Sequence, residues 1–263
     1  MDNGMNHTIA TVDAGEMRSM FRAVAYAADK RHVREHHRCV HLRVEDQRLV
    51  MAATDGFQMG KAWTSVEAGD TGSFGLNVDV LTIAIGMLPK TGAVEIARAE
   101  DVVTFECDSN TSHVKIDSNW SDWRGIKPSG EYQTVPIDLV ETMALCRAMK
   151  LSTKAYDRTL LKFATWPMIA GDAGEVRLWA QWLNAWVDVA VIAELRKPSV
   201  AWSYLMQYRM FAKMAIAAVR RNKHQDHRLS LRAKSLALIE TFNESGHANA
   251  VHMIAPWDDR RES

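Results

Sequence analysis

Four histidines and one cysteine between residues 31 and 41 are the side chains best suited to bind a metal ion. They are His32, His36, His37, Cys39 and His41. Zn²⁺ accepts imidazole nitrogen and thiolate sulfur, and a helix would place His32 and His36 on one face. The segment is also rich in Arg, lacks a second ligand cluster and matches no established zinc spacing. We therefore expect a polar connecting loop here, and a metal-dependent hydrolase with its site at this cluster is the alternative hypothesis.

Other catalytic arrangements have little support. The segment from Gly69 to Gly72 lacks the Lys and the strand–helix context of a phosphate-binding loop. No Ser–His–Asp arrangement can be proposed from the sequence. We predict no catalytic residue, no metal and no cofactor, and therefore a protein that is not an enzyme.

Composition sets the broad class of the protein. The chain has 263 residues, of which 47% are hydrophobic and 24% charged, as in a soluble globular protein of one large or two ordinary domains. Basic and acidic residues both number 32, so any electrostatic function depends on local segregation of charge. Three scattered cysteines, a polar start and no apolar run of about 20 residues predict a cytoplasmic protein.

Periodicity predicts two helices in each half of the chain. In the first half they run from Asp13 to Lys30 and from Val78 to Leu88, with strands near 40–44, 49–53, 94–96, 102–106 and 113–116. Residues 120–130 break all periodicity and are interpreted as a linker. In the second half the helices are predicted at 137–151 and 203–222, with strands near 160–165, 176–182, 186–192, 228–231, 236–242 and 250–254.

The two halves share one order of elements. The helices begin at residues 13 and 138 and at residues 77 and 203, which gives offsets of 125 and 126 residues. Matched order and matched offset indicate an internal duplication of two α+β units.

Two short motifs carry a resemblance to a known family. Thr54-Asp55-Gly56 has the composition of a tight turn between paired strands, and Trp120-Ser121-Asp122-Trp123 precedes Ile126-Lys127-Pro128. With the duplication, they resemble the bacterial replication sliding clamp, the β subunit of DNA polymerase III. The closing segment of that family is usually Phe-Pro-Asp-aromatic, so Trp120 and Ser121 depart from its pattern.

The resemblance implies a fold and two domains. The middle domain of the family corresponds to residues 9–128 and its last domain to residues 133–257, whereas its usual first domain has no counterpart. The fold class expected is α+β, with two tandem clamp-like domains that each carry two helices on one face of an antiparallel sheet.

The resemblance also implies a function. The family closes into a ring around duplex DNA and tethers a polymerase and other partners, and its rings contain six such domains. Two domains per chain therefore imply a homotrimer, and closed cyclic symmetry makes such a ring plausible. The implied partners are double-stranded DNA read without sequence preference, a DNA polymerase, a clamp loader and further copies of the chain, without a membrane.

Basic residues at helical spacing support this role, because Lys and Arg can hold phosphates without reading bases. Arg18 and Arg22 share one stripe of the first predicted helix, whereas the second predicted helix carries Asp79 and no basic residue. The expected DNA-binding residues are Arg18, Arg22, Arg147, Lys150, Lys154, Arg209, Lys213 and Arg220. A solvated helix face is the alternative interpretation of each stripe.

The resemblance further implies a partner-peptide pocket between the two domains. Its expected residues are Thr54, Gly56, Phe57, Gln58, Met59, Pro128, Val251, Met253 and Ile254. The family commonly has His-Arg where Phe57 and Gln58 stand, so the partner motif is expected to differ. The alternative is that Met59, Val251 and Met253 are core residues.

Two hypotheses of different classes follow. The first is a DNA sliding clamp that acts as a polymerase processivity factor. The second is a clamp-like interaction protein that binds clamp-binding peptides without encircling DNA. Loading onto circular DNA, and its loss when the circle is cut, distinguishes them.

Overall fold

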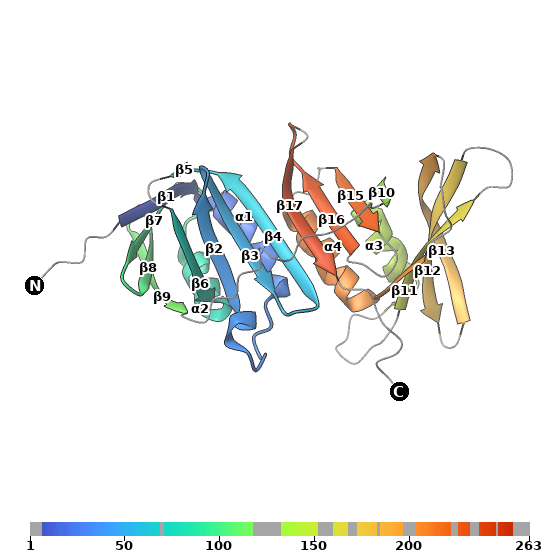
Figure 1. Cartoon of the computed structure of the whole chain (residues 1–263), viewed down its shortest axis with the longest axis horizontal. Coiled ribbons are helices and arrows are strands. Elements are labelled where there is room, and N and C mark those ends of the chain that lie inside the picture. Colours follow the sequence, from blue (N-terminus) through green and yellow to red (C-terminus); the bar gives the residue numbers. More distant parts are fainter. Residues whose placement is uncertain are drawn as a thin grey trace, which may run out of the picture. The chain divides into compact units, whose positions relative to one another are not determined.

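The computed structural model describes residues 7–68, 71–117, 133–151, 160–167, 173–182, 185–196, 203–221, 226–231, 237–245 and 247–254. The chain divides into two compact units, residues 1–126 and 127–263 (Figure 1). The predicted linker at residues 120–130 lies outside the described residues. The predicted domain bounds, 9–128 and 133–257, stay predictions.

The described residues of the first unit form two helices and nine strands. In chain order the elements are β1 (His7–Asp13), α1 (Ala14–Val24), the 3₁₀ turns η1 (Ala25–Ala27) and η2 (Glu35–Arg38), β2 (Cys39–Glu45), β3 (Arg48–Thr54), β4 (Gln58–Ser65), β5 (Glu67–Ala68), β6 (Gly72–Asn77), α2 (Val78–Met87), β7 (Ala93–Ala99), β8 (Val102–Cys107) and β9 (Asn110–Asp117).

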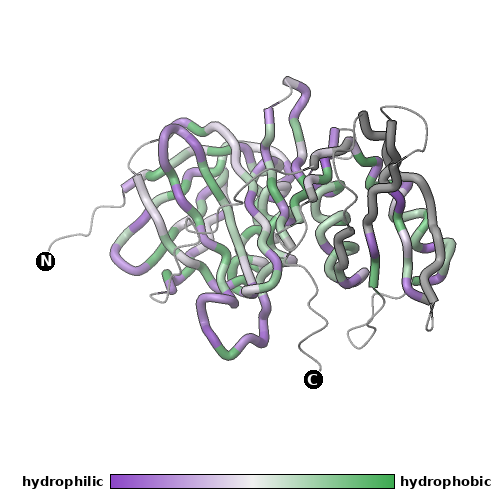
Figure 2. Tube along the Cα trace, turned by 45° about the vertical axis from the view of Figure 1, so that its right-hand side comes forward, coloured by the Kyte–Doolittle hydropathy of each residue, from purple (hydrophilic) through white to green (hydrophobic). Residues whose placement is uncertain are grey.

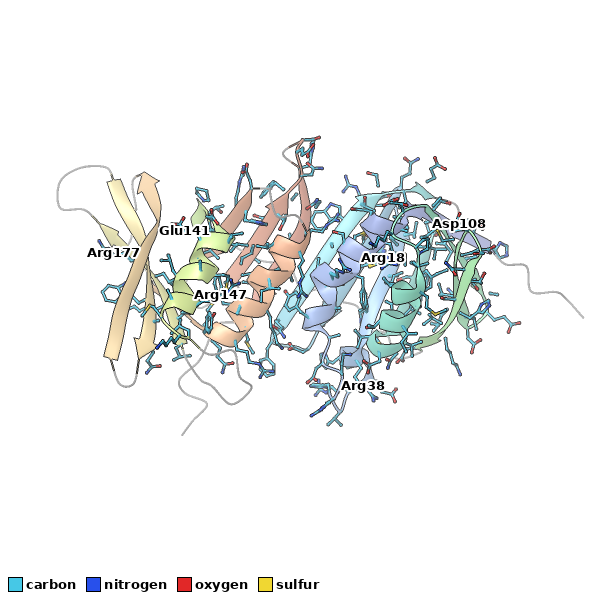
Figure 3. The ribbon with its side chains drawn as sticks, turned by 180° about the vertical axis from the view of Figure 1, so that it is seen from behind. Arg18, Arg38, Asp108, Glu141, Arg147 and Arg177 are labelled. Atoms are coloured by element: carbon cyan, nitrogen blue, oxygen red, sulfur yellow. The ribbon has the colours of Figure 1, made fainter. Side chains whose placement is uncertain are left out.

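The strands of the first unit follow the order β4-β3-β2-β6-β9-β8-β7-β1-β5, and each pair is antiparallel. Both helices cover the same side of this sheet (Figure 3). Helix α1 starts where the Asp13 carboxylate accepts a hydrogen bond from the backbone N–H of Glu16 at 3.0 Å, as an N-cap does. Met17 and Met20 of α1 are fully buried, so this helix supplies part of the core.

Close packing of α1 on the sheet depends on one glycine. A Cβ added to Gly60 of β4 would lie 3.0 Å from Val24 Cα and 3.2 Å from the Ala23 carbonyl oxygen. Both atoms are backbone, so a side chain at this position would push the helix away from the strand.

The second unit has the elements β10 (Gln133–Pro136), α3 (Leu139–Ala148), β11 (Leu160–Pro167), β12 (Ala173–Trp182), β13 (Ala185–Arg196), β14 (Ser203–Gln207), α4 (Tyr208–Arg221), β15 (His227–Leu231), β16 (Ala237–Phe242) and β17 (Ala248–Ile254). Its strands follow the orders β13-β12-β11-β14 and β10-β15-β16-β17. Helix α3 is capped by the Asp138 carboxylate, which accepts from Glu141 N at 2.8 Å.

The predicted duplication and the α+β class are confirmed by this topology. The order β4-β3-β2-β6 of the first unit is matched by β13-β12-β11-β14, and β9-β8-β7-β1 is matched by β17-β16-β15-β10. In both units one helix follows the first strand and the other precedes the last three strands. The two units are therefore one fold used twice.

One predicted helix begins too early. Residues 203–207 form β14, whose register pairs Ser203 with Ala164 and Gln207 with Leu160. Helix α4 starts only at Tyr208, so α2 and α4 begin 130 residues apart instead of 126. The apolar run of Tyr204, Leu205 and Met206 fits a buried strand as well as a helix, and periodicity alone does not distinguish the two.

Other differences concern the ends of elements. His7–Asp13 forms strand β1 and Gln133–Pro136 forms strand β10, and neither strand was predicted. Helix α1 ends at Val24 and continues as a 3₁₀ turn, short of the predicted end at Lys30. None of the helices in the described residues is long and apolar enough to cross a membrane.

Candidate functional site

The β3–β4 turn, Thr54 to Met59, is held by hydrogen bonds within itself. The Asp55 carboxylate accepts from the backbone N–H groups of Phe57 and Gln58, both at 2.9 Å, and from Gln58 Nε2 at 2.7 Å. Thr54 Oγ1 donates to the Gln58 carbonyl oxygen at 2.9 Å and accepts from Gly56 N at 3.1 Å. The turn is thus a rigid element, and the Asp55 carboxylate is used to build it.

The backbone conformation of the turn requires a glycine at position 56, and the turn exposes the side chain of Phe57. Gly56 has φ +89°, a left-handed conformation that favours glycine. Phe57 is 49% exposed, whereas Thr54, Gln58 and Met59 are buried. Of the pocket residues predicted here, Phe57 offers the largest apolar surface to a partner.

The other predicted pocket residues belong to the second unit or lie outside the description. Val251 and Met253 lie on β17, opposite Glu240 and Leu238 of β16. Val251 is half-buried and Met253 is buried. Ile254 ends β17, and Pro128 lies outside the described residues.

His37 is a neighbour of the turn that sequence reasoning did not include in the pocket. Its Nδ1 lies 3.0 Å from the Thr54 backbone oxygen, and a Cβ added to Gly56 would lie 3.5 Å from His37 Cε1. Since a carbonyl oxygen only accepts, Nδ1 carries the proton and donates. The sequence places His37 17 residues before Thr54, and no spacing rule connects them.

The loop that carries His37 is folded on itself. Asp29 N donates to the His37 carbonyl oxygen at 2.8 Å, and His37 N donates to that of Arg34 at 3.1 Å. The ring centroids of His32 and His36 lie 4.3 and 4.2 Å from that of His37. Burial, with the nearby charges of His37 and Arg34, lowers the pKa of His36. The predicted polar loop is therefore an ordered basic loop, residues 29–38.

The His and Cys side chains considered as possible metal ligands lie in different environments. Within the described residues, no three His, Cys, Asp or Glu side chains are placed to hold a metal ion. The Cys39 thiol donates to Asp117 Oδ2 at 3.2 Å, and burial and this carboxylate raise the pKa of Cys39 to about 12. Burial and a neighbouring carboxylate both oppose formation of the thiolate, which is the form of cysteine that binds a metal. Burial lowers the pKa of His41 to about 4.

The two predicted DNA-binding arginines of α1 have different environments. Arg18 is half-buried, and its Nε donates to the Pro89 carbonyl oxygen at 3.1 Å, just after α2. Arg22 is exposed in the last turn of α1. Arg18 therefore contributes to the packing of α1 beside α2 (Figure 3). Arg22 is the one of the two that is available to a ligand.

The predicted DNA-binding residues of the second unit that the structure describes lie on α3, just after it and on α4. Arg147 of α3 and Arg220 of α4 are exposed, whereas Arg209 and Lys213 of α4 are half-buried and take part in other interactions. Lys150 is exposed with φ +58°, in the left-handed position that often follows a helix end. Lys154 lies outside the described residues.

Helix α2 has an apolar outer side in place of a basic one. Val80, Ile83 and Met87 are 45%, 66% and 56% exposed. The carboxylate of Asp79 is paired with Lys30. Among the four helices of the described chain, α2 therefore offers no cation to a polyanion.

Comparison with known proteins shows the fold. No protein-family model matches the chain, and no curated protein does. Solved structures with the same fold include a DNA polymerase III beta subunit from Eubacterium rectale (TM-score 0.78, 13% identity, 99% of this chain and 68% of that chain). Others are the DNA polymerase sliding clamp of Bacillus subtilis (TM-score 0.78, 15% identity, 98% and 65%) and the beta subunit of the DNA polymerase of Streptococcus pyogenes (TM-score 0.77, 12% identity, 98% and 67%).

The extent of these matches is as informative as their quality. Nearly the whole chain aligns, yet it spans only about two thirds of the length of the matched clamps. The chain has the fold of DNA polymerase III beta sliding clamps, over a length that corresponds to part of them.

Proposed function

We propose that the chain is a DNA sliding clamp, a non-enzymatic processivity factor that encircles duplex DNA and tethers a polymerase. The observation that carries the proposal is one clamp fold used twice in the chain, with a structural match over 98–99% of its residues. Exposed basic residues on or beside three of the described helices, Arg22, Arg147, Lys150 and Arg220, suit contact with phosphates.

A ring needs more than one chain. With two units per chain, three copies supply the six units that the resemblance implies, and cyclic symmetry closes such an assembly. The chain weighs 29.6 kDa, so a trimer weighs about 89 kDa. Mass photometry and sedimentation at micromolar concentration measure this directly, and a stable monomer there would contradict the ring.

Topological attachment to DNA is the second test. The protein, incubated with a clamp loader and ATP, is expected to remain on nicked circular plasmid through a high-salt gel-filtration step. It is expected to leave after a restriction enzyme linearises the same plasmid. Equal retention on circular and linear DNA would indicate ordinary electrostatic binding instead.

Partner attachment is proposed at the β3–β4 turn and at β17. The predicted pocket residues within the described part of the chain are Thr54, Gly56, Phe57, Gln58, Met59, Val251, Met253 and Ile254. The hydrogen-bonded turn and the exposed Phe57 support this assignment, because an apolar side chain presented from a preorganised backbone suits peptide binding. The neutral outer side of α2 favours one alternative, a clamp-like protein that binds clamp-interacting peptides without encircling DNA. Peptide binding without retention on circular DNA is the result expected from that alternative.

A further inference from the structure

The basic loop, residues 29–38, lies against the β3–β4 turn at one end of the first unit (Figure 1). His37 connects the two segments through its hydrogen bond to Thr54 and its approach to Gly56. The ends of the loop are closed by the hydrogen bond from Asp29 N to the His37 carbonyl oxygen. Side chains of the loop are therefore presented from a fixed backbone beside the proposed partner site.

Unneutralised positive charge gathers on this loop. Of its cations, Lys30 is paired with Asp79, and Arg38 lies 3.5 Å from Glu35. Arg31 and Arg34 are exposed, and neither guanidinium has a carboxylate partner in the part of the chain that the structure describes. The Asp29 carboxylate accepts from the backbone N–H of Arg31 at 3.1 Å and is engaged in the loop itself.

Exposed apolar side chains accompany these cations. Val33, between the two arginines, is 94% exposed, and Phe57 of the adjoining turn is 49% exposed. The loop is otherwise hydrophilic along most of its length (Figure 2). Contacts to a duplex backbone are polar and charged, whereas peptide recognition combines apolar anchors with flanking charge. The combination favours a peptide over DNA as the ligand of this loop.

We infer that the basic loop is a specificity element that selects acidic partner segments, those in which Asp or Glu flanks the apolar anchor bound at the β3–β4 turn. Arg31 and Arg34 supply the charge, and His37 holds the loop in place. This inference rests on the partner-peptide role of the turn in the proposed function, and it does not depend on ring closure.

Electrostatics of this kind have a modest and measurable size. Two exposed ion pairs should together give about 2- to 30-fold tighter binding of an acidic peptide than of a neutral one. Such a preference should weaken as salt increases, because exposed charges are screened.

The test uses three fluorescent 12-residue peptides with one central Leu-Phe pair and acidic, neutral or basic flanks. Fluorescence anisotropy with the full chain is measured at low and high salt. We expect the acidic peptide to bind about 2- to 30-fold more tightly than the neutral one at low salt, and the basic peptide to bind most weakly. Equal affinity for acidic and neutral peptides, or no binding of any of the three, would overturn the inference.

Matched variants separate the loop from general charge effects. Arg31→Glu with Arg34→Glu should abolish the preference for acidic flanks. Arg98→Glu with Lys115→Glu changes the charge by the same amount on β7 and β9, also at exposed positions, and should leave the preference intact. If both pairs reduce the preference equally, the loop is not the selective element.

The same variants distinguish this inference from the proposed function. The loop variant should remain on circular plasmid like the unsubstituted protein. Loss of DNA retention in the loop variant, with unchanged peptide preference, would identify the loop as a DNA contact and overturn the inference. A protein that discriminates the peptides but never remains on circular DNA would contradict the ring alone.

Discussion

The Nε of Arg18 donates to the carbonyl oxygen of Pro89 at 3.1 Å, which links the middle of α1 to the chain just after α2. A cation near a helix C-terminus also interacts favourably with the helix dipole. Arg22, one turn later in the same helix, is exposed. Both arginines were predicted to bind DNA. Arg18 is engaged in packing within the first unit, whereas Arg22 is exposed.

This difference predicts unequal effects of alanine on stability. Arg18→Ala should lower the free energy of unfolding by about 1–2 kcal/mol, because it removes a part-buried charged hydrogen bond. Arg22→Ala should change it by less than about 0.5 kcal/mol, as an exposed substitution does. Urea unfolding of both variants in one buffer checks the prediction, and equal effects would contradict the packing role of Arg18.

DNA retention should depend on the exposed cations of the helices. Arg22→Glu combined with Arg147→Glu and Arg220→Glu should shorten the lifetime on circular DNA and flatten the dependence of binding on salt, because fewer counterions are released. Arg48→Glu combined with Arg98→Glu and Lys115→Glu is the charge-matched control, since these three residues are exposed on strands β3, β7 and β9. Similar losses in triple variant and control would show that only net charge matters.

The hydrogen bond from His37 to Thr54 should govern the position of the basic loop. His37→Leu keeps an apolar contact with Gly56 but removes the donor, so we expect a loss of about 1 kcal/mol in stability and a weaker preference for acidic peptides. His37→Asn can donate from its amide nitrogen and should restore part of both properties. Unchanged peptide preference in His37→Leu would show that the loop is held by other contacts.

Two glycines of the first unit should respond in opposite directions to alanine. Gly60→Ala places a Cβ 3.0 Å from Val24 Cα and should destabilise the protein by about 1–3 kcal/mol. Gly86→Ala in α2 meets no atom within 4 Å and should stabilise it by about 0.5–1 kcal/mol. A urea midpoint of Gly60→Ala that is unchanged or higher would contradict the close approach of α1 and β4, and a lower midpoint of Gly86→Ala would contradict the open space at α2.

Two buried histidines should make the fold sensitive to acid. Burial lowers the pKa of His41 from 6.5 to about 4 and that of His252 from 6.5 to about 3. Below pH 6.5 the unfolded chain binds protons that the folded chain excludes, so stability falls as pH falls. For each pH unit below about 6.5, each of these histidines should lower the free energy of unfolding by about 1.4 kcal/mol. The effect should continue down to about pH 4 for His41 and to about pH 3 for His252.

Urea unfolding at pH 7.5, 6.0 and 5.0 measures this effect. The midpoint should be constant above about pH 7 and should decrease between pH 6 and 5, a range in which both folded-state imidazoles remain neutral. A constant midpoint over the whole range would contradict the burial of His41 and His252.

Order and spacing of elements were predictable from sequence because they depend on local pattern. The helix starts predicted at 13 and 138 are Ala14 and Leu139 in the structure, and the turn at Asp55-Gly56 joins β3 to β4. Residues 203–207 were assigned wrongly, because an apolar run fits a buried strand and a helix alike. The deciding fact was the pairing with β11, which involves residues about 40 positions away.

Site residues were less predictable because their roles depend on tertiary contacts. Helical spacing placed Arg18 and Arg22 on one stripe but could not show that Arg18 reaches Pro89, 71 residues later. Likewise, His37 was grouped with possible metal ligands, and only the fold brings it to Thr54.

The uncharged outer side of α2 has a mechanical consequence for the proposed assembly. In a closed trimer this neutral helix would recur three times, so attraction to the polyanion would be discontinuous around the circumference. A clamp that contacts the DNA phosphates at separated positions meets a smaller energy barrier to sliding than a clamp with a continuous basic lining. In an assembly whose α2 helices face the DNA, lysines introduced at Val80, Ile83 and Met87 should slow one-dimensional diffusion, because each adds an attraction to phosphate.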